Sequence, residues 1–110
     1  MRVITGTARG IQLKTPTGFL TRPTAERVKE ALFSAIQFDI PGARVLDLFA
    51  GTGQLGIEAL SRGAARAVFV DMRLDACRLV RENLRRTGLS DRAAVVQGDY
   101  LRYLEHSKDT

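Results

Sequence analysis

The chain has 110 residues, of which 45% are hydrophobic and 26% are charged, and its formal net charge at pH 7 is +5. This composition indicates one globular domain or part of one, and it excludes a disordered chain and, without a run of about 18 apolar residues, a membrane span. A single cysteine, Cys77, excludes an internal disulfide and fits a reducing compartment, so we expect a cytoplasmic location.

The positive charge is concentrated at the start of the chain. Residues 1–30 hold six basic and two acidic side chains, a net charge of +4, whereas the rest of the chain holds 11 basic and 10 acidic ones. This asymmetry favours contact with a polyanion such as nucleic acid, although a solvated basic surface would have the same composition.

The first third of the chain predicts a hairpin and a helix. Residues 2–5 and 11–14 alternate polar and apolar side chains around Gly6 and Gly10, which is typical of a short β-hairpin. A helix is predicted from Thr24, as its N-cap, to about Gln37. The positions that we expect on its buried face are Val28, Ala31, Leu32, Ala35 and Ile36.

From residue 43 onward, strands and helices alternate. Strands are predicted at 44–50, 67–71 and 93–99, the first of them apolar enough to be buried on both faces. Helices are predicted at 54–62, at 73–87 and from Tyr100 onward. The side chains expected to face inward from the second of these helices are Leu74, Cys77, Val80 and Leu84.

This alternation predicts an α/β fold in which parallel strands are joined by right-handed crossovers. The expected architecture is the N-terminal half of a doubly wound, mostly parallel sheet, preceded by the hairpin and the first helix. We divide the chain into residues 1–42, a basic hairpin and helix that pack on the sheet, and residues 43–110, a cofactor-binding half.

The stretch VLDLFAGTGQLGIEAL, residues 45–60, contains three glycines in G-x-G-x-x-G spacing. A dinucleotide would place its pyrophosphate at the start of the following helix, where the charge of Asp47 would oppose it by roughly 3 kcal/mol at about 6 Å and an effective dielectric constant near 20. A P-loop is excluded because Ile57 and Glu58 stand where Lys and Ser/Thr are required.

S-adenosylmethionine fits both the glycines and the carboxylate, because it has no phosphate and carries a sulfonium and an ammonium group. Asp71 lies 20 residues after Gly51, where an acid at a strand end accepts the ribose hydroxyls. Asp99 is expected to accept from the adenine amino group, although a helix N-cap is the ordinary alternative for Asp71 or Asp99. No metal site is predicted. The predicted cofactor-binding residues are Asp47, Phe49, Gly51, Gly53, Asp71, Met72, Asp99 and Tyr100.

Together with this stretch, the segments MRVITGTARGIQLKTP and TRPTAERVKEALF closely resemble the bacterial 16S ribosomal RNA guanine-N2 methyltransferase D family, a family of class I S-adenosylmethionine-dependent methyltransferases. The resemblance implies methyl transfer to a guanine exocyclic amine in small-subunit ribosomal RNA, with the substrate presented within a small-subunit particle. It also implies that the hairpin and the region from Arg22 to Lys29 engage RNA. The expected RNA-binding residues are Arg9, Lys14, Arg22, Thr24 and Arg27.

Three other functions stay open at this point. They are a methyltransferase for a small molecule or a protein, a noncatalytic nucleic-acid-binding remnant, and, least favoured, a dinucleotide oxidoreductase. The basic residues 1–30 argue against the first of these.

The chain departs from the resembled family in one respect. That family carries an Asn/Asp-Pro-Pro-Tyr element after a fourth strand, whereas the single asparagine here, Asn83, lies in a predicted helix and the three prolines are isolated. We therefore expect no catalytic residue in this chain, which would be a fragment inactive on its own. Its first strand would leave an open apolar edge, flanked by Leu46, Leu48 and Phe49, through which copies could associate.

Overall fold

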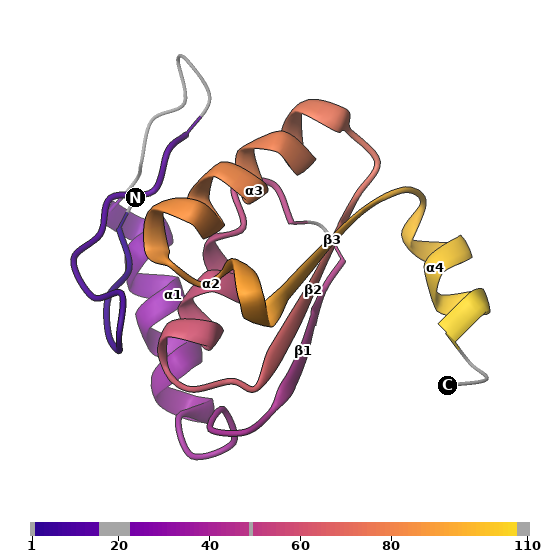
Figure 1. Ribbon diagram of the computed structural model, residues 1–110. Coiled ribbons are helices and arrows are strands. Elements are labelled where there is room, and N and C mark those ends of the chain that lie inside the picture. Colours follow the sequence, from indigo (N-terminus) through magenta and orange to yellow (C-terminus); the bar gives the residue numbers. More distant parts are fainter. Residues whose placement is uncertain (1, 16–22, 49, 108–110) are drawn as a thin grey trace.

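The computed structural model describes residues 2–15, 23–48 and 50–107, which form a three-stranded sheet with helices on both faces (Figure 1). The elements in chain order are α1 (Pro23–Ile36), β1 (Arg44–Asp47), α2 (Gln54–Ser61), β2 (Arg66–Asp71), α3 (Leu74–Thr87), the 3-10 turn η1 (Ser90–Arg92), β3 (Ala93–Gln97) and α4 (Tyr100–Ser107). None of the helices in these ranges is both long and apolar enough to cross a membrane.

All three strands are parallel and lie in the order β1-β2-β3, which confirms the predicted α/β fold. Strand β1 is shorter than predicted, because it ends at Asp47 rather than at residue 50. The prediction that it is buried on both faces is wrong. It is an edge strand of the described sheet, its residues alternate between exposed and half-buried, and Leu46 keeps 42% of its surface exposed.

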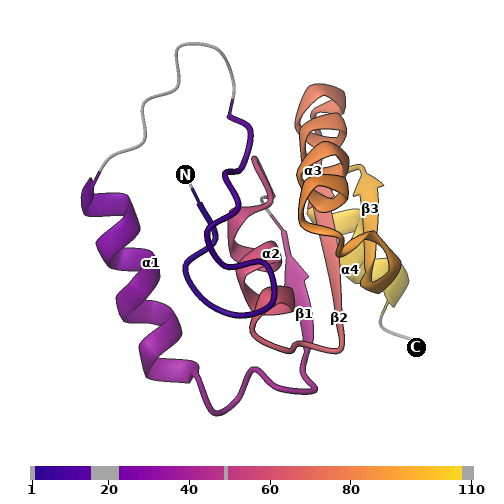
Figure 2. The same cartoon turned by 60° about the vertical axis from the view of Figure 1, so that its left-hand side comes forward.

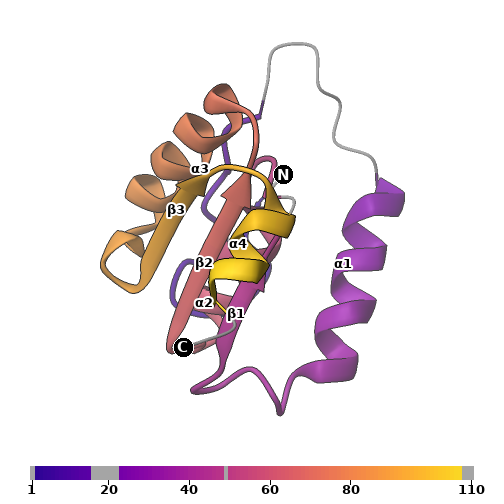
Figure 3. The ribbon, with the colours of Figure 1, turned by 90° about the vertical axis from the view of Figure 1, so that its right-hand side faces the viewer.

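Helices α2 and α3 cover one face of the sheet, and α4 lies on the opposite face (Figures 2 and 3). Both α2 and α3 end close to the predicted positions, and Gly88 caps α3 in the left-handed conformation at φ 71°. Of the four side chains expected to face inward from α3, three are buried. Leu74 is the exception: it stands in the first turn and is 44% exposed.

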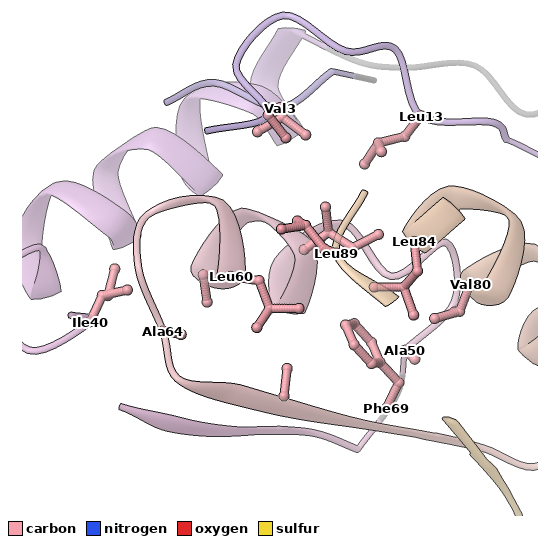
Figure 4. Close-up of a cluster of buried hydrophobic side chains, with 14 of the residues drawn as sticks. Val3, Leu13, Ile40, Ala50, Leu60, Ala64, Phe69, Val80, Leu84 and Leu89 are labelled. Carbon is pink, nitrogen blue, oxygen red and sulfur yellow. The ribbon is translucent and has the colours of Figure 1, made fainter. Parts of the chain in front are cut away.

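The main core lies between the sheet and α2 and α3, and it also takes in side chains from the start of the chain. Val3 and Leu13 reach the same cluster as Phe69 of β2 and Val80 of α3 (Figure 4). Burial of such side chains stabilises the fold by about 1.5–3 kcal/mol each. Residues before α1 therefore belong to the same hydrophobic core as the sheet.

The described residues 2–15, here called the N-terminal segment, form a minimal version of the predicted hairpin. Its two arms are joined by one antiparallel bridge, Arg2 to Gln12, and by two backbone hydrogen bonds, from the Val3 amide to the Ile11 carbonyl at 3.0 Å and from the Gly10 amide to the Val3 carbonyl at 2.9 Å. The amides of Ile4 and Thr5 instead donate to the carboxylate of Glu58 in α2, at 2.9 and 3.1 Å. A side chain of α2 thus accepts the hydrogen bonds that the Ile4 and Thr5 amides would make in a longer hairpin.

Helix α1 begins at Pro23, a favourable first helical residue, so Thr24 is its second residue rather than the predicted N-cap. The predicted inward face of α1 is also wrong. Lys29 and Phe33 are buried at 3% exposure each, whereas Val28 is 63% exposed. The Lys29 ammonium lies 3.1 Å from Glu58, and the guanidinium of Arg62 lies 4.8 Å from the centre of the Phe33 ring. These contacts set the rotation of α1 about its axis.

The remaining predicted inward positions of α1 also face outward. Leu32 and Ile36 are 45% and 37% exposed, and Ala31 and Ala35 are exposed as well. The apolar stripe predicted to be core is therefore an exposed stripe within the described part of the chain.

Candidate functional site

Three loops meet at the carboxyl edge of the sheet, and a predicted acidic residue stands at the end of β1, at the end of β2 and in the loop after β3. The strand register staggers these residues. Asp47 is level with Phe69, so Asp71 stands two residues, about 7 Å, further along the strand direction, and Asp99 follows two residues after Gln97, which is level with Asp71. The sequence prediction that the three acids share one edge agrees with this geometry.

The glycine loop, residues 50–53, is held against the end of β2. The amide of Ala50 donates to the Val70 carbonyl at 3.2 Å, and the amide of Gly51 donates to Asp71 Oδ2 at 3.1 Å. Gly51 is exposed and has φ 57°. Helix α2 starts directly afterwards without a side-chain cap, so its first amides are available for hydrogen bonds to a ligand.

The other two glycines of the motif are buried and serve close packing. A Cβ atom on Gly56 would lie 2.3 Å from the Phe69 ring, and one on Gly53 would lie 3.2 Å from Val80. Gly53 also adopts φ 82°, which side chains rarely tolerate. These two glycines bring α2 and the loop close to β2 and α3, and Gly51 is the one at the surface.

Asp71 and Asp99 both make local hydrogen bonds in addition to any ligand contact. Asp71 Oδ1 accepts from the Arg73 amide at 2.9 Å while its Oδ2 holds Gly51. Asp99 Oδ1 accepts from the Leu101 amide at 2.8 Å and so caps α4, the alternative that the sequence left open. A carboxylate has about four acceptor positions, so both groups keep capacity for hydroxyl or amino donors.

The remaining predicted cofactor residues are placed only in part. Asp47 is half-buried at the end of β1, and Met72 is 66% exposed just after β2. Phe49 lies outside the described residues, and the side chain of Tyr100, the first residue of α4, is also outside them.

The donors and acceptors at this edge suit a cationic ligand that carries hydroxyl and amino groups. Gln54 adds an acceptor that sequence reasoning did not single out: its Oε1 is buried and accepts no hydrogen bond from the residues described. Its position as the first residue of α2, directly after the glycine loop, was the signal that could have identified it. No group of three or more metal-ligating side chains occurs in the described ranges.

The predicted RNA-binding residues are either exposed or outside the described chain. Arg9, Lys14 and Arg27 are exposed. The loop that carries Arg9 lies beside α1, where Arg2, Arg9 and Glu30 line a polar cavity of about 320 Å³. Arg22 falls outside the described residues, as does the side chain of Thr24.

Lys14 also faces an acidic group. The pKa of Glu82 on α3 is lowered by its hydrogen bond and ion pair with Arg85 and, to a smaller extent, by the charge of Lys14.

A buried charged cluster under the N-terminal segment is the main feature that sequence reasoning missed. Glu58 is fully buried and is held by Lys29 and by Arg62, whose Nε lies 2.9 Å from Oε2. Burial raises the pKa of Glu58, but the hydrogen bonds from Ile4 and Arg62 and the charge of Lys29 outweigh it, so the pKa lies below its ordinary value. The signal was a charged residue within the most apolar stretch of α2.

The chain is similar to proteins that are named as methyltransferases. Residues 1–110 match the family described as "Conserved hypothetical protein 95". The Bacillus subtilis protein "Putative rRNA methyltransferase YlbH" is 47% identical over 94% of this chain and 56% of its own length. "Ribosomal RNA small subunit methyltransferase D" of Escherichia coli is 47% identical over 66% of this chain and 36% of its own length.

A solved structure shows the same fold. "Putative methyltransferase yhhF from Escherichia coli" superposes with a TM-score of 0.84 at 40% sequence identity, covering 94% of this chain and 56% of that one. The chain thus spans about half the length of that protein and of the Bacillus relative.

Proposed function

The chain belongs to the family described as conserved hypothetical protein 95, and from this membership we propose that the protein containing it is an S-adenosylmethionine-dependent ribosomal RNA methyltransferase. The resemblance seen in the sequence is confirmed at the level of the family. The observation that carries the proposal is the glycine loop fixed to Asp71 by the 3.1 Å hydrogen bond from Gly51, at the carboxyl edge where doubly wound folds bind their ligands.

Residues of this edge would hold the cofactor through acceptors and backbone amides. Asp71 has remaining acceptor capacity for the ribose hydroxyls, and Asp99 for the adenine amino group. Asp47, deeper along the sheet, favours the positive charge at the methionyl end. When bound, the cofactor supplies a methyl group on a sulfonium, and the exposed Gly51 lets backbone approach it closely.

The substrate that we propose is the exocyclic amine of a guanine in small-subunit ribosomal RNA, presented within a small-subunit particle. Two features support RNA over a protein or a small molecule: the names of the relatives and the exposed basic side chains of Arg9, Lys14 and Arg27. A flipped guanine needs an acceptor that aligns its weakly nucleophilic amine with the methyl group. We assign that acceptor to no residue of this chain.

Calorimetric titration with S-adenosylhomocysteine tests the cofactor assignment. In Asp71→Asn, one acceptor oxygen becomes an amino group that opposes the amide of either Gly51 or Arg73, so affinity should fall by about 1–3 kcal/mol. Asp75→Asn is the matched control, because Asp75 is an exposed acid in the next helix that pairs with Arg73. Unchanged affinity in Asp71→Asn would remove Asp71 from the site, and binding of NAD in place of the cofactor would refute the proposal.

Transfer of labelled methyl groups tests the substrate. Small ribosomal subunits, free ribosomal RNA and ribosomal proteins are offered in parallel to the whole protein that contains this chain, and label is expected in guanine of the subunit RNA. Label in a ribosomal protein would identify a protein methyltransferase. RNA binding without any transfer would identify the noncatalytic remnant.

A further inference from the structure

Asn83 of α3 joins two parts of the chain that are far apart in sequence. It is fully buried and contacts both Lys14 of the N-terminal segment and Thr52 of the glycine loop. We propose that Asn83 is a positioning residue that ties the N-terminal segment to the glycine loop, so that order in one is transmitted to the other. This coupling deepens the proposed function and rests on it only where the cofactor is concerned.

The side-chain amide of Asn83 is fully used by these contacts. Its Oδ1 accepts from the Lys14 amide at 2.6 Å, and its Nδ2 donates to the Lys14 carbonyl at 3.0 Å and to the Thr52 carbonyl at 2.8 Å. Reversing the amide would place donor against donor and acceptor against acceptor at all three positions. The orientation is therefore fixed by both partners at once.

The rest of the N-terminal segment is anchored elsewhere. Ile4 and Thr5 bind Glu58, while the amides of Thr7 and Ala8 donate to the carbonyl and the hydroxyl oxygen of Ser61, both at 2.9 Å. Glu58 and Ser61 lie in the second half of α2, away from the glycine loop that precedes the helix. Among the contacts of the described segment, the pair of bonds to Asn83 is the one that leads directly to the loop.

The position of the tie gives it a functional consequence. Thr52 stands between Gly51, which is fixed to Asp71, and Gly53, the N-cap of α2. Lys14 has an exposed side chain, and its backbone amide and carbonyl are both hydrogen-bonded to Asn83. A ligand that orders the loop thus also orders the backbone of Lys14, and coupling of this kind is reciprocal.

Hydrogen exchange of the ligand-free protein tests the tie. Asn83→Leu keeps a similar volume and removes all three hydrogen bonds, so exchange should become about tenfold faster or more both at residues 10–14 and at Gly51 and Gly53. Thr87→Val is the matched control, because Thr87 is a buried polar residue one turn further along α3 whose hydroxyl bonds only carbonyls of its own helix.

A second pair of variants approaches the tie from its other end. Lys14→Pro removes the amide that donates to Asn83, and Lys14→Ala keeps that amide while removing the same side chain. Exchange at Gly51 and Gly53 should rise in the proline variant and stay unchanged in the alanine variant. The proposal would be overturned if Asn83→Leu made exchange faster only at residues 10–14 or only at Gly51 and Gly53. It would also be overturned if Thr87→Val made exchange faster by the same factor at both.

Addition of S-adenosylhomocysteine extends the test to the cofactor. It should slow exchange at residues 10–14 several-fold in the unmodified protein and leave it unchanged in Asn83→Leu. Slowing that persists in Asn83→Leu would contradict the coupling. Absence of binding to the unmodified protein would count against the proposed function, and the ligand-free exchange would still decide the tie.

Discussion

At the scale of single residues, Glu58 connects three parts of the chain through one carboxylate. Oε1 accepts from the Ile4 amide and the Lys29 ammonium, and Oε2 accepts from the Thr5 amide and Arg62. These four donors fill the acceptor positions of a carboxylate, which is the condition for a buried charge to be tolerated. Removing the carboxylate would therefore leave the buried Lys29 ammonium without its counter-charge.

We expect Glu58→Gln to destabilise the protein by about 3–5 kcal/mol near neutral pH, because the Lys29 ammonium loses its counter-charge. The pKa of Glu58 in the folded state is lowered, so the contribution of its charge is complete above the unfolded pKa of about 4.3 and is lost as pH falls through the folded value. Urea unfolding measured from pH 7 to pH 3 should show that the gap between the two proteins narrows in acid.

The control for this series is Glu82→Gln, which removes an exposed ion pair with Arg85 on α3 and should change stability by less than about 1 kcal/mol. A gap for Glu58→Gln that stayed constant down to pH 3 would contradict the ionised state of Glu58.

At the scale of elements, the sequence predicted α1 correctly as a helix and wrongly in its rotation. The pattern placed the apolar side chains of Val28, Leu32 and Ile36 inward, since helix amphipathicity normally marks the core face. The structure instead buries Lys29 and Phe33, because α1 packs through Glu58 and Arg62 of α2. Contacts made through ion pairs leave no trace in a hydrophobic pattern.

Two truncations on adjacent positions of α1 test this rotation. Phe33→Ala should cost about 3–5 kcal/mol, because it empties a buried site, whereas Leu32→Ala should cost less than about 1 kcal/mol. Chemical denaturation of both variants gives the comparison. The reverse order of the two losses would restore the rotation predicted from the sequence.

The same contrast holds for the candidate site. The meeting of Gly51 and Asp71 was predictable, because the glycine spacing and the alternation of strands and helices place both at one edge of the sheet, although β1 and β3 end before their predicted positions. The anchoring of the N-terminal segment was not, since the amides of Thr5, Ala8 and Lys14 donate to side chains of α2 and α3, which are Glu58, Ser61 and Asn83. Which distant side chain satisfies a given amide depends on tertiary packing, and local alternation of side chains does not contain that information.

At the scale of the whole molecule, the exposed basic residues of the N-terminal segment and α1 predict a salt-dependent contact with RNA. Neutralising Arg9 and Arg27 together should lower the slope of log affinity against log salt by about 1–2, because each phosphate contact releases counterions. Cofactor affinity should stay unchanged.

The matched control is the pair Arg78→Gln and Arg86→Gln, which removes the same net charge from exposed positions of α3. An equal fall of the slope in the control would assign the effect to net charge alone. Loss of cofactor affinity with an unchanged slope would place Arg9 and Arg27 at the cofactor site instead.

The open side of β1 predicts how copies of the chain interact. In the described sheet β1 pairs only with β2, so its other side presents backbone amides and carbonyls beside Leu46, which is 42% exposed. An apolar strand edge of this kind is a template for pairing with the same edge of a second copy. We therefore expect residues 1–110 to self-associate, with a mass that rises with concentration in light scattering.

Leu46→Lys places a charge on that edge and should shift the association to higher concentration, because each pairing would then bring two lysines together. Leu55→Lys, which changes an equally exposed leucine at 41% on α2, should leave the association as it is. A monomer at all concentrations, or an equal effect of both lysines, would show that β1 does not pair between copies.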